Sequence, residues 1–285
     1  MTANKEPQIR NSALRFFVLV YFLSAPFWLF QLFIDKTNLP LNIPITDIGA
    51  AFTPLIAACI MSYKENGKTG VRNLLLRIFD FKKLRLKWWL VIVLLPLLIF
   101  SSIYFFLKTN SYPIPDKWTV SFYSIPLLLL FFYLGAIGEE VGYMGYVVEK
   151  LQNKFSAFWT SIIIGVPWII WHYPSIFQQG RNLNFIFWGT LGTIAFRTIY
   201  VWLYNNTNKS LSACIFLHCL YNTGRVIFPS DQHNNPLVNF PNIHYGVLVL
   251  IAVTITLLWG HKTLDLLHWD KYNVYISLNV YSSQY

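Results

Sequence analysis

The chain has 285 residues, of which 55% are hydrophobic, 18% aromatic and only 12% charged. Soluble domains carry about 25% charged residues, so this composition excludes an ordinary soluble domain and indicates a protein of the lipid bilayer. The net charge of +10, from 22 basic and 12 acidic residues, is typical of cytoplasmic loops that face anionic lipid, and we expect no nucleic-acid partner.

The apolar stretches predict an all-α fold: a polytopic membrane helix bundle of about eight transmembrane helices, forming a single domain over residues 1–285. No small-residue cleavage pattern follows the first stretch, so we interpret it as a span and not as a signal peptide. Pro167 and Pro174 are expected to kink or end the fifth span. The predicted spans cover residues 14–34, 47–63, 88–107, 122–140, 155–177, 185–204, 211–228 and 245–259.

The connection over residues 64–87 is strongly basic, with eight Lys or Arg residues against Glu65 and Asp80. Its middle is expected to form an amphipathic helix at the membrane surface. By the positive-inside rule this connection is cytoplasmic. An even number of spans then places both termini in the cytoplasm, and we expect a multi-pass protein of the cell membrane.

Polar side chains interrupt three of the apolar stretches. Glu139 and Glu140 follow the apolar run of the fourth span, His172 lies in PWIIWHYPS, and His218 and Asn222 lie in IFLHCLYN. Ionisable groups at membrane depth are costly and face a bundle interior or a wet cavity, where they have partners. His218 and Asn222 are four residues apart and share one helix face. We therefore expect the three places to converge.

A carboxylate, two imidazoles and an amide in a low-dielectric site suit hydrolysis. Glu139 could act as general base on a water molecule, with a histidine sharing the proton and the other histidine and Asn222 donating to an oxyanion. Alternatively, Glu139, His172 and His218 form the ligand set of a catalytic zinc ion with an open fourth position. The residues themselves leave both versions open.

These motifs resemble those of the CPBP family, the CAAX protease and bacteriocin-processing membrane proteases, also called the Abi family. GEEVGYMGYVVEKLQ resembles the first motif, which begins with two glutamates. PWIIWHYP resembles the second, in which Trp168 stands where the family usually has Phe, and His218 with Asn222 resembles the third. The resemblance covers residues 134–223, the motif region.

One position departs from the family pattern. The arginine that usually follows the second glutamate by four residues is replaced by Met144. Because that arginine is expected to brace Glu140, we predict that Arg197 in the sixth span pairs with Glu140 instead, with Arg225 as the second choice. The departure also favours a weakened enzyme or a non-proteolytic relative.

The resemblance implies an intramembrane, glutamate-dependent endopeptidase of a group historically classed with metalloproteases. By this carry-over Glu139 and His172 activate the water, His218 and Asn222 form the oxyanion site, and Glu140 supports them. The implied substrates are peptides or membrane-protein segments, including prenylated CAAX peptides, and the implied roles include bacteriocin processing and self-immunity. We favour a reaction that requires no cofactor, with zinc as the alternative.

Two other classes of function remain open. One is a non-catalytic bacteriocin-immunity or scaffold protein on the same fold, which Met144 favours. The other is a proton-coupled transporter, although the sequence shows no repeated halves. No HExxH helix of a conventional zinc protease is present. The other histidines, expected to be solvated or interfacial, are His233, His244, His261 and His268.

Overall fold

The structure is a computed structural model that describes residues 5–33, 45–115, 120–231 and 234–265. Every regular element in these ranges is helical, so the predicted all-α fold is confirmed. The short elements include the 3-10 turns η2 (Arg77–Phe79), η3 (Phe81–Lys83) and η4 (Phe122–Ser124) and the π-helix η5 (Val141–Val147). The α-helices are α1 (Lys5–Gln31), α2 (Ile45–Ala50), α3 (Thr53–Leu76), α4 (Leu86–Thr109), α5 (Ile125–Glu140), α6 (Val148–Gln152), α7 (Ala157–Gln178), α8 (Leu183–Asn206), α9 (Leu211–Ile227), α10 (Pro236–Asn239) and α11 (Pro241–Trp259).

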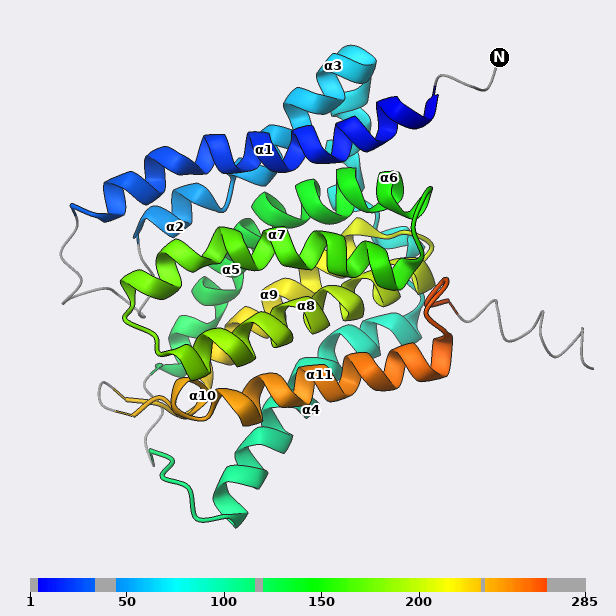
Figure 1. Cartoon of the computed structure of the whole chain (residues 1–285). Coiled ribbons are helices and arrows are strands. Elements are labelled where there is room, and N and C mark those ends of the chain that lie inside the picture. Colours follow the sequence, from blue (N-terminus) through cyan, green and yellow to red (C-terminus); the bar gives the residue numbers. More distant parts are fainter. Residues whose placement is uncertain (1–4, 34–44, 116–119, 232–233, 266–285) are drawn as a thin grey trace, which may run out of the picture.

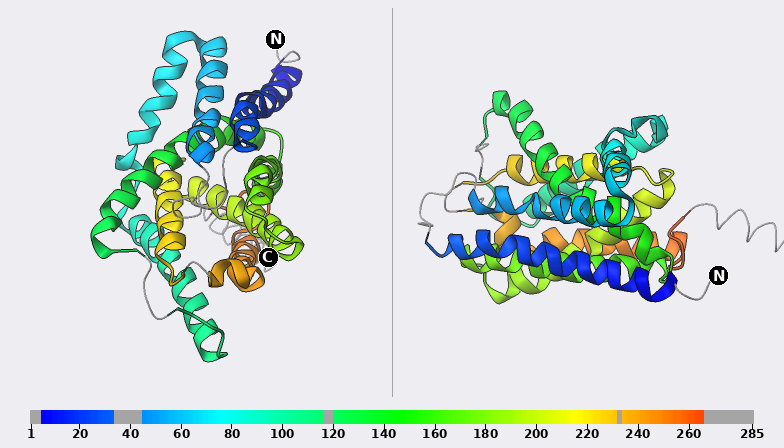
Figure 2. Two further views of the ribbon diagram at one scale, coloured as in Figure 1. Left: turned by 90° about the vertical axis from the view of Figure 1, so that its left-hand side faces the viewer. Right: turned by 90° about the horizontal axis from the view of Figure 1, so that it is seen from above.

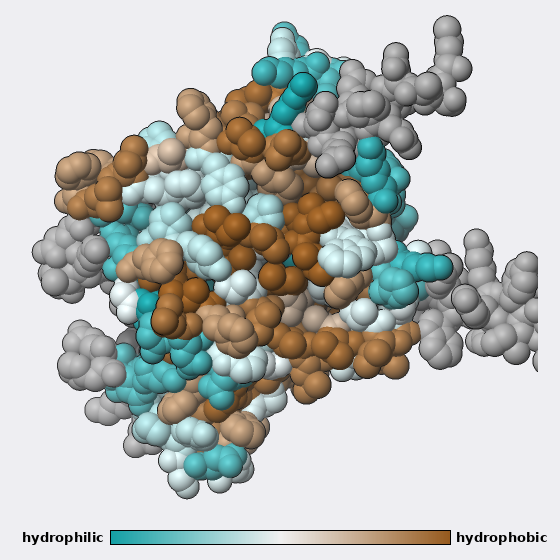
Figure 3. Space-filling model, in the orientation of Figure 1, coloured by the Kyte–Doolittle hydropathy of each residue, from teal (hydrophilic) through white to brown (hydrophobic). Residues whose placement is uncertain are grey.

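Six helical stretches of the described chain are long and apolar enough to cross a membrane, which makes this a multi-pass membrane protein. The other two predicted spans correspond to α3, whose second half is charged, and α9, which has 17 residues. Helix α9 nevertheless lies within the bundle (Figure 1), whereas α3 projects from it (Figure 2). Apolar side chains cover much of the middle of the face in Figure 3, as expected of a surface that meets lipid. The six stretches are Ser12–Gln31, Leu86–Thr109, Phe122–Gln152, Ala157–Gln178, Leu183–Asn206 and Pro241–Trp259.

Prolines lie in the first turn of several helices, α3 among them, and inside others, α7 among them. The span predicted over residues 47–63 is divided, because α2 ends at Ala50 and α3 starts at Thr53 with Pro54 in its first turn. Proline suits a first turn, where its missing N–H would have no helical partner. Pro167 and Pro174 lie inside α7, which ends at neither and continues to Gln178.

Helix α3 breaks at Asn66 and Gly67, and its two halves form a hairpin that projects from the bundle (Figure 2). Gly67 has a φ of 59° and a ψ of −153°, a backbone conformation that side chains with a Cβ rarely adopt. A Cβ on Gly70 would lie 2.6 Å from the carbonyl oxygen of Ser62, so the two halves are in close contact near the tip. The helix predicted within residues 64–87 is present as the second half of this hairpin, and its position at the membrane surface stays a prediction.

The start of α9 is fixed by a carboxylate from the basic connection. Asp80 accepts hydrogen bonds from the hydroxyl group of Ser210 at 2.7 Å and from the backbone N–H of Ser212 at 3.1 Å. The first N–H groups of a helix have no helical acceptor, and the helix dipole favours a negative charge there. Asp80 therefore holds the helix that carries His218.

The same end of the bundle is closed by the residues that follow α11. Their carbonyl groups accept hydrogen bonds from the start of α7 and from the end of α8. The donors and acceptors are Ala157 N to Lys262 O at 2.8 Å, Phe158 N to His261 O at 3.2 Å, Asn205 Nδ2 to Thr263 O at 2.7 Å, and Asn206 Nδ2 to Leu264 O at 2.7 Å.

Polar contacts between α1 and α7 lie on both sides of His172. They join the two helices at three points along their length and hold α7 where its prolines interrupt the helical hydrogen bonds. The pairs are Tyr21 Oη to Pro167 O at 2.7 Å, Trp171 Nε1 to Ser24 Oγ at 2.7 Å, and Gln178 Nε2 to Gln31 O at 2.8 Å.

Candidate active site

The two glutamates lie where α5 changes into the π-helix η5. Glu139 and Glu140 are the last residues of α5, and both are buried, at 7% and 0% exposure. A π-helix is wider than an α-helix and is frequently found at functional sites. The widened turn starts at Val141, so the backbone is irregular immediately after the carboxylates.

Glu140 lies between two cationic or potentially cationic groups. Its Oε2 accepts a hydrogen bond from Arg197 Nη1 at 2.6 Å, and its Oε1 lies 2.8 Å from His218 Nδ1. The predicted pairing of Arg197 with Glu140 is therefore present, although its role in the reaction stays a prediction. Arg225, the second choice, is exposed near the end of α9.

Arg197 has no exposed surface and is surrounded by aromatic rings. Its guanidinium carbon lies 3.6 Å from the centre of the Trp168 ring, 4.8 Å from that of Tyr143 and 5.0 Å from that of Tyr200. Cation–π attraction is strongest where the cation is desolvated. The rings therefore offset part of the cost of burying this charge.

Glu139 faces α7. Its Oε2 accepts a hydrogen bond from the indole N–H of Trp168 at 2.6 Å and lies 4.0 Å from His172 Nε2. Trp168 and His172 are one helical turn apart and therefore share a face of α7. The side chain of His172 is 32% exposed, whereas that of Glu139 is 9% exposed, so His172 forms the open edge of the cluster.

Trp168 connects the two halves of the cluster. Its ring centre lies 5.4 Å from that of His172 and 6.0 Å from that of His218. Glu139, Glu140, His172 and His218 thus converge, as the sequence predicts. Asn222 follows His218 by one turn of α9 and is half-buried, and within the described residues its amide makes no hydrogen bond.

Zinc requires several ligands around one point. Among the described residues no group of three His, Cys, Asp or Glu side chains could hold a metal ion. His218 directs Nδ1 at Glu140, and Trp168 donates to Oε2 of Glu139, so these contacts engage neither His218 Nε2 nor Glu139 Oε1. Zinc ligation by Glu139, His172 and His218 therefore stays the alternative that the sequence left open.

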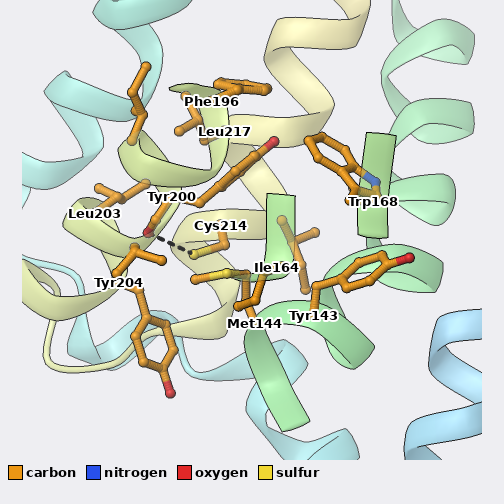
Figure 4. Close-up of a cluster of buried hydrophobic side chains, with 14 of the residues drawn as sticks. Tyr143, Met144, Ile164, Trp168, Phe196, Tyr200, Leu203, Tyr204, Cys214 and Leu217 are labelled. Carbon is orange, nitrogen blue, oxygen red and sulfur yellow. Dashed lines mark hydrogen bonds between the residues drawn. The ribbon is translucent and has the colours of Figure 1, made fainter. Parts of the chain in front are cut away.

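Met144 is fully buried in apolar surroundings. Figure 4 shows it beside Ile164 and Cys214, on the side of the core opposite the ring of Trp168. An unpaired arginine would be costly among these side chains. Position 144, where the motif of the resembling family has an arginine, therefore holds a core side chain. Arg197 of α8 supplies the positive charge beside Glu140 instead.

Sequence reasoning missed the aromatic neighbours of the cluster, Tyr143 and Tyr200, and the role of Trp168 as a hydrogen-bond donor. Its spacing of one turn from His172 is the signal that could have revealed Trp168. His244 was also placed wrongly: it is buried in α11, and its Nε2 lies 2.8 Å from Tyr221 Oη. The expectations for His233 and His268 fall outside the described residues.

Comparison with known proteins agrees with the motifs. Residues 119–224 match the family described as type II CAAX prenyl endopeptidase Rce1-like. The CAAX prenyl protease 2 of Methanococcus maripaludis is 28% identical over 221 residues, which cover 72% of this chain and 78% of that protein. The segment that matches the family, residues 119–224, includes the whole motif region over residues 134–223. The resemblance inferred from the motifs is therefore confirmed.

Proposed function

We propose that this multi-pass relative of the CAAX prenyl endopeptidases is an intramembrane endopeptidase that hydrolyses peptide bonds. The observation that carries the proposal is the convergence of Glu139 with His172 and of Glu140 with His218 around Trp168. Buried ionisable side chains from three helices are costly unless they serve a purpose. A water-activating pair beside a second histidine is suited to peptide hydrolysis.

Glu139 and His172 are the proposed water-activating pair. The 4.0 Å between Glu139 Oε2 and His172 Nε2 exceeds a direct hydrogen bond, and a water molecule can bridge such a gap. Trp168 also donates to Oε2, which fixes the carboxylate that accepts a proton from that water. The exposed edge at His172 gives the substrate its approach.

His218 and Asn222 are the proposed oxyanion site. With Nδ1 directed at the carboxylate of Glu140, the other ring nitrogen of His218 is left for the substrate. In the doubly protonated ring that nitrogen is a donor, and Asn222 adds an amide donor from the next turn. Two donors preorganised in a desolvated site stabilise the charge that develops on the carbonyl oxygen.

Glu140 is the proposed supporting residue. Arg197 and His218 occupy both of its oxygens, so it orients the imidazole and does not itself meet the substrate water. The two adjacent carboxylates therefore have different roles. Glu140 is paired with the cation of Arg197, whereas Glu139 accepts a hydrogen bond from the neutral indole of Trp168.

The proposed substrates are peptides or membrane-anchored protein segments, including prenylated CAAX peptides, and the relative from Methanococcus maripaludis is named a CAAX prenyl protease. We propose that no metal is required. Metal content of the active, purified protein tests this point independently of activity.

The proposal is tested by cleavage of a library of membrane-anchored peptides with the purified chain in liposomes. Glu139→Ala and His218→Ala are each expected to lower kcat by at least about 100-fold, since general acid–base catalysis and an oxyanion donor each contribute about that much. The matched control is His261→Ala, a histidine at the end of the bundle outside the site. Cleavage at the wild-type rate by each of the two single variants would exclude this mechanism.

A non-catalytic immunity or scaffold role on the same fold is the alternative that Met144 favours. It predicts an inert wild type that still protects cells against a bacteriocin, with Glu139→Ala protecting equally well. Loss of protection in Glu139→Ala would instead tie any such role to hydrolysis.

A further inference from the structure

The hairpin of α3 carries a groove that has no part in the proposed hydrolysis. The groove has a volume of about 470 Å³ and lies along the second half of the hairpin, with Tyr63 contributed by the first half and Phe79 by η2. It is lined by Tyr63, Lys68, Val71, Arg72, Leu75, Leu76 and Phe79.

The lining of the groove changes from basic to apolar side chains along its length. Lys68 and Arg72 are four residues apart, share one helix face near the hairpin tip, and are both exposed. Toward η2 the lining becomes apolar, and Leu76 and Phe79 are 51% and 63% exposed. Cations at one end and exposed apolar side chains at the other match a molecule with an anionic head and a hydrocarbon tail.

The acidic residues of this segment do not neutralise the groove. Glu65 turns to the bundle, where Lys150 Nζ lies 2.8 Å and Tyr146 Oη 2.6 Å from its carboxylate oxygens. Burial raises the pKa of Glu65, but the hydrogen bonds from Lys150 and Tyr146 outweigh it and hold that pKa below its ordinary value. At neutral pH its carboxylate is therefore charged and contacts Lys150 and Tyr146 of the bundle, not the groove.

Asp80 behaves in the same way at the start of α9. Burial raises its pKa, whereas hydrogen bonds from Ser210 and Ser212 lower it further than burial raises it. Neither carboxylate is paired with Lys68 or Arg72, and among the described residues these two cations have no ion-pair partner. The outward face of the hairpin is left with an unbalanced positive charge.

The hairpin lies at the end of the bundle where the basic connection joins α4, and it projects sideways from the helices (Figure 2). We expect a basic arm at the end of membrane-spanning helices to lie at the level of the lipid headgroups. Basic residues at this level attract anionic lipid, at about 1 kcal/mol for each Lys or Arg.

We propose that this groove is a binding site for one acidic phospholipid. The phosphate group lies between Lys68 and Arg72, and one acyl chain lies along Leu75, Leu76 and Phe79. The inference does not depend on the proposed peptidase activity.

The test is titration of the purified full chain in detergent with phosphatidylglycerol, with bound lipid counted by native mass spectrometry. Phosphatidylcholine with the same acyl chains is the comparison, and glycerophosphoglycerol supplies the phosphodiester headgroup and the glycerol backbone without acyl chains. We expect phosphatidylglycerol to bind at least about 10-fold more tightly than either. Equal binding of phosphatidylcholine, or equal binding of glycerophosphoglycerol, would overturn the proposal.

Paired variants separate a site from general attraction. Lys68→Ala/Arg72→Ala is expected to lower phosphatidylglycerol affinity by about 10-fold or more, since each basic residue contributes near the surface. Lys82→Ala/Arg85→Ala removes the same charge from exposed positions of the same segment outside the groove, and it should retain the affinity. Equal losses in both would overturn the site. If the alanine pair unfolds, Lys68→Gln/Arg72→Gln keeps the side-chain stems and the same expectation applies.

Discussion

At the scale of single residues, the fully buried charge of Glu140 determines much of the arrangement around it. A carboxylate with no exposed surface is costly without an opposite charge. Arg197 provides that charge from a helix other than the one that carries the family arginine. The aromatic rings around Arg197 then hold the cation in one place, so α5, α7 and α8 depend on one another through this pair.

We expect Arg197→Met to lower the free energy of unfolding by about 3–5 kcal/mol, because it leaves Glu140 buried without its ion-pair partner. Thermal unfolding in detergent measures the change. The control is Arg225→Met, which removes an exposed arginine and is expected to change stability by less than about 0.5 kcal/mol.

The double substitution Arg197→Met/Met144→Arg returns the cation to the position usual in the family. It is expected to recover part of the stability lost in Arg197→Met and part of the cleavage activity. A single Arg197→Met variant as stable and active as the wild type would show that the pair supports neither property.

The polar part of the site was predictable because Glu, His and Asn are rare inside membrane spans and stand out from apolar sequence. The pairing of Arg197 followed from the same argument. Trp168, Tyr143 and Tyr200 could not be singled out, because aromatic residues are frequent throughout this chain and most of them only pack. His244 was misplaced since its helix starts at Pro241, earlier than its hydropathy indicates.

At the scale of helices, the path of η5 depends on its close approach to α3. A Cβ on Gly142 would lie 2.7 Å from both the carbonyl oxygen and the Cβ of Pro54. Small residues allow such backbone contacts between membrane helices. This contact holds the π-helix, and with it the two glutamates, against the first turn of α3.

Gly142→Ala is therefore expected to lower the free energy of unfolding by about 1–3 kcal/mol through overpacking, measured by thermal unfolding in detergent. Gly135→Ala lies two turns earlier and meets nothing within 4 Å, so it is the matched control. It should be neutral or stabilising by up to about 1 kcal/mol, because alanine is a better helix former than glycine. Similar destabilisation by both substitutions would contradict the role of this contact.

The predicted helices agree with the observed ones to within a few residues wherever a long apolar run is bounded by polar residues, as for α4 and α8. The π-helix could not be predicted from the sequence, because its seven residues have the apolar character of an ordinary α-helix in a membrane. The fold-back of α3 was missed because Asn66 and Gly67 were read as part of a loop. Their backbone conformation shows that they form a turn between two helices.

At the scale of the whole molecule, the basic connection and the residues after α11 lie at one end of the bundle. Arg77, in the basic connection, donates to the carbonyl oxygen of Gly145 at 2.7 Å, and Asn205 donates to Thr263 at the same end. Positive loops face the cytoplasm. We therefore propose that this end of the bundle is cytoplasmic.

Cysteine labelling in intact cells tests this orientation, in a background that lacks the three native cysteines. Ser111→Cys, beyond the far end of α4, is expected to react with a membrane-impermeant maleimide. Lys82→Cys should react only after the membrane is permeabilised. The reverse pattern would place the basic connection outside.

The contacts between residues 261–264 and the ends of α7 and α8 have a consequence for biosynthesis. The donors on α7 and α8 leave the ribosome long before their acceptors do, because α9 and α11 are translated in between. This end of the bundle can close only after α11 has entered the bilayer. Until then the backbone N–H groups of Ala157 and Phe158 must be satisfied by water or by lipid headgroups, so the last helix completes the assembly of those made before it.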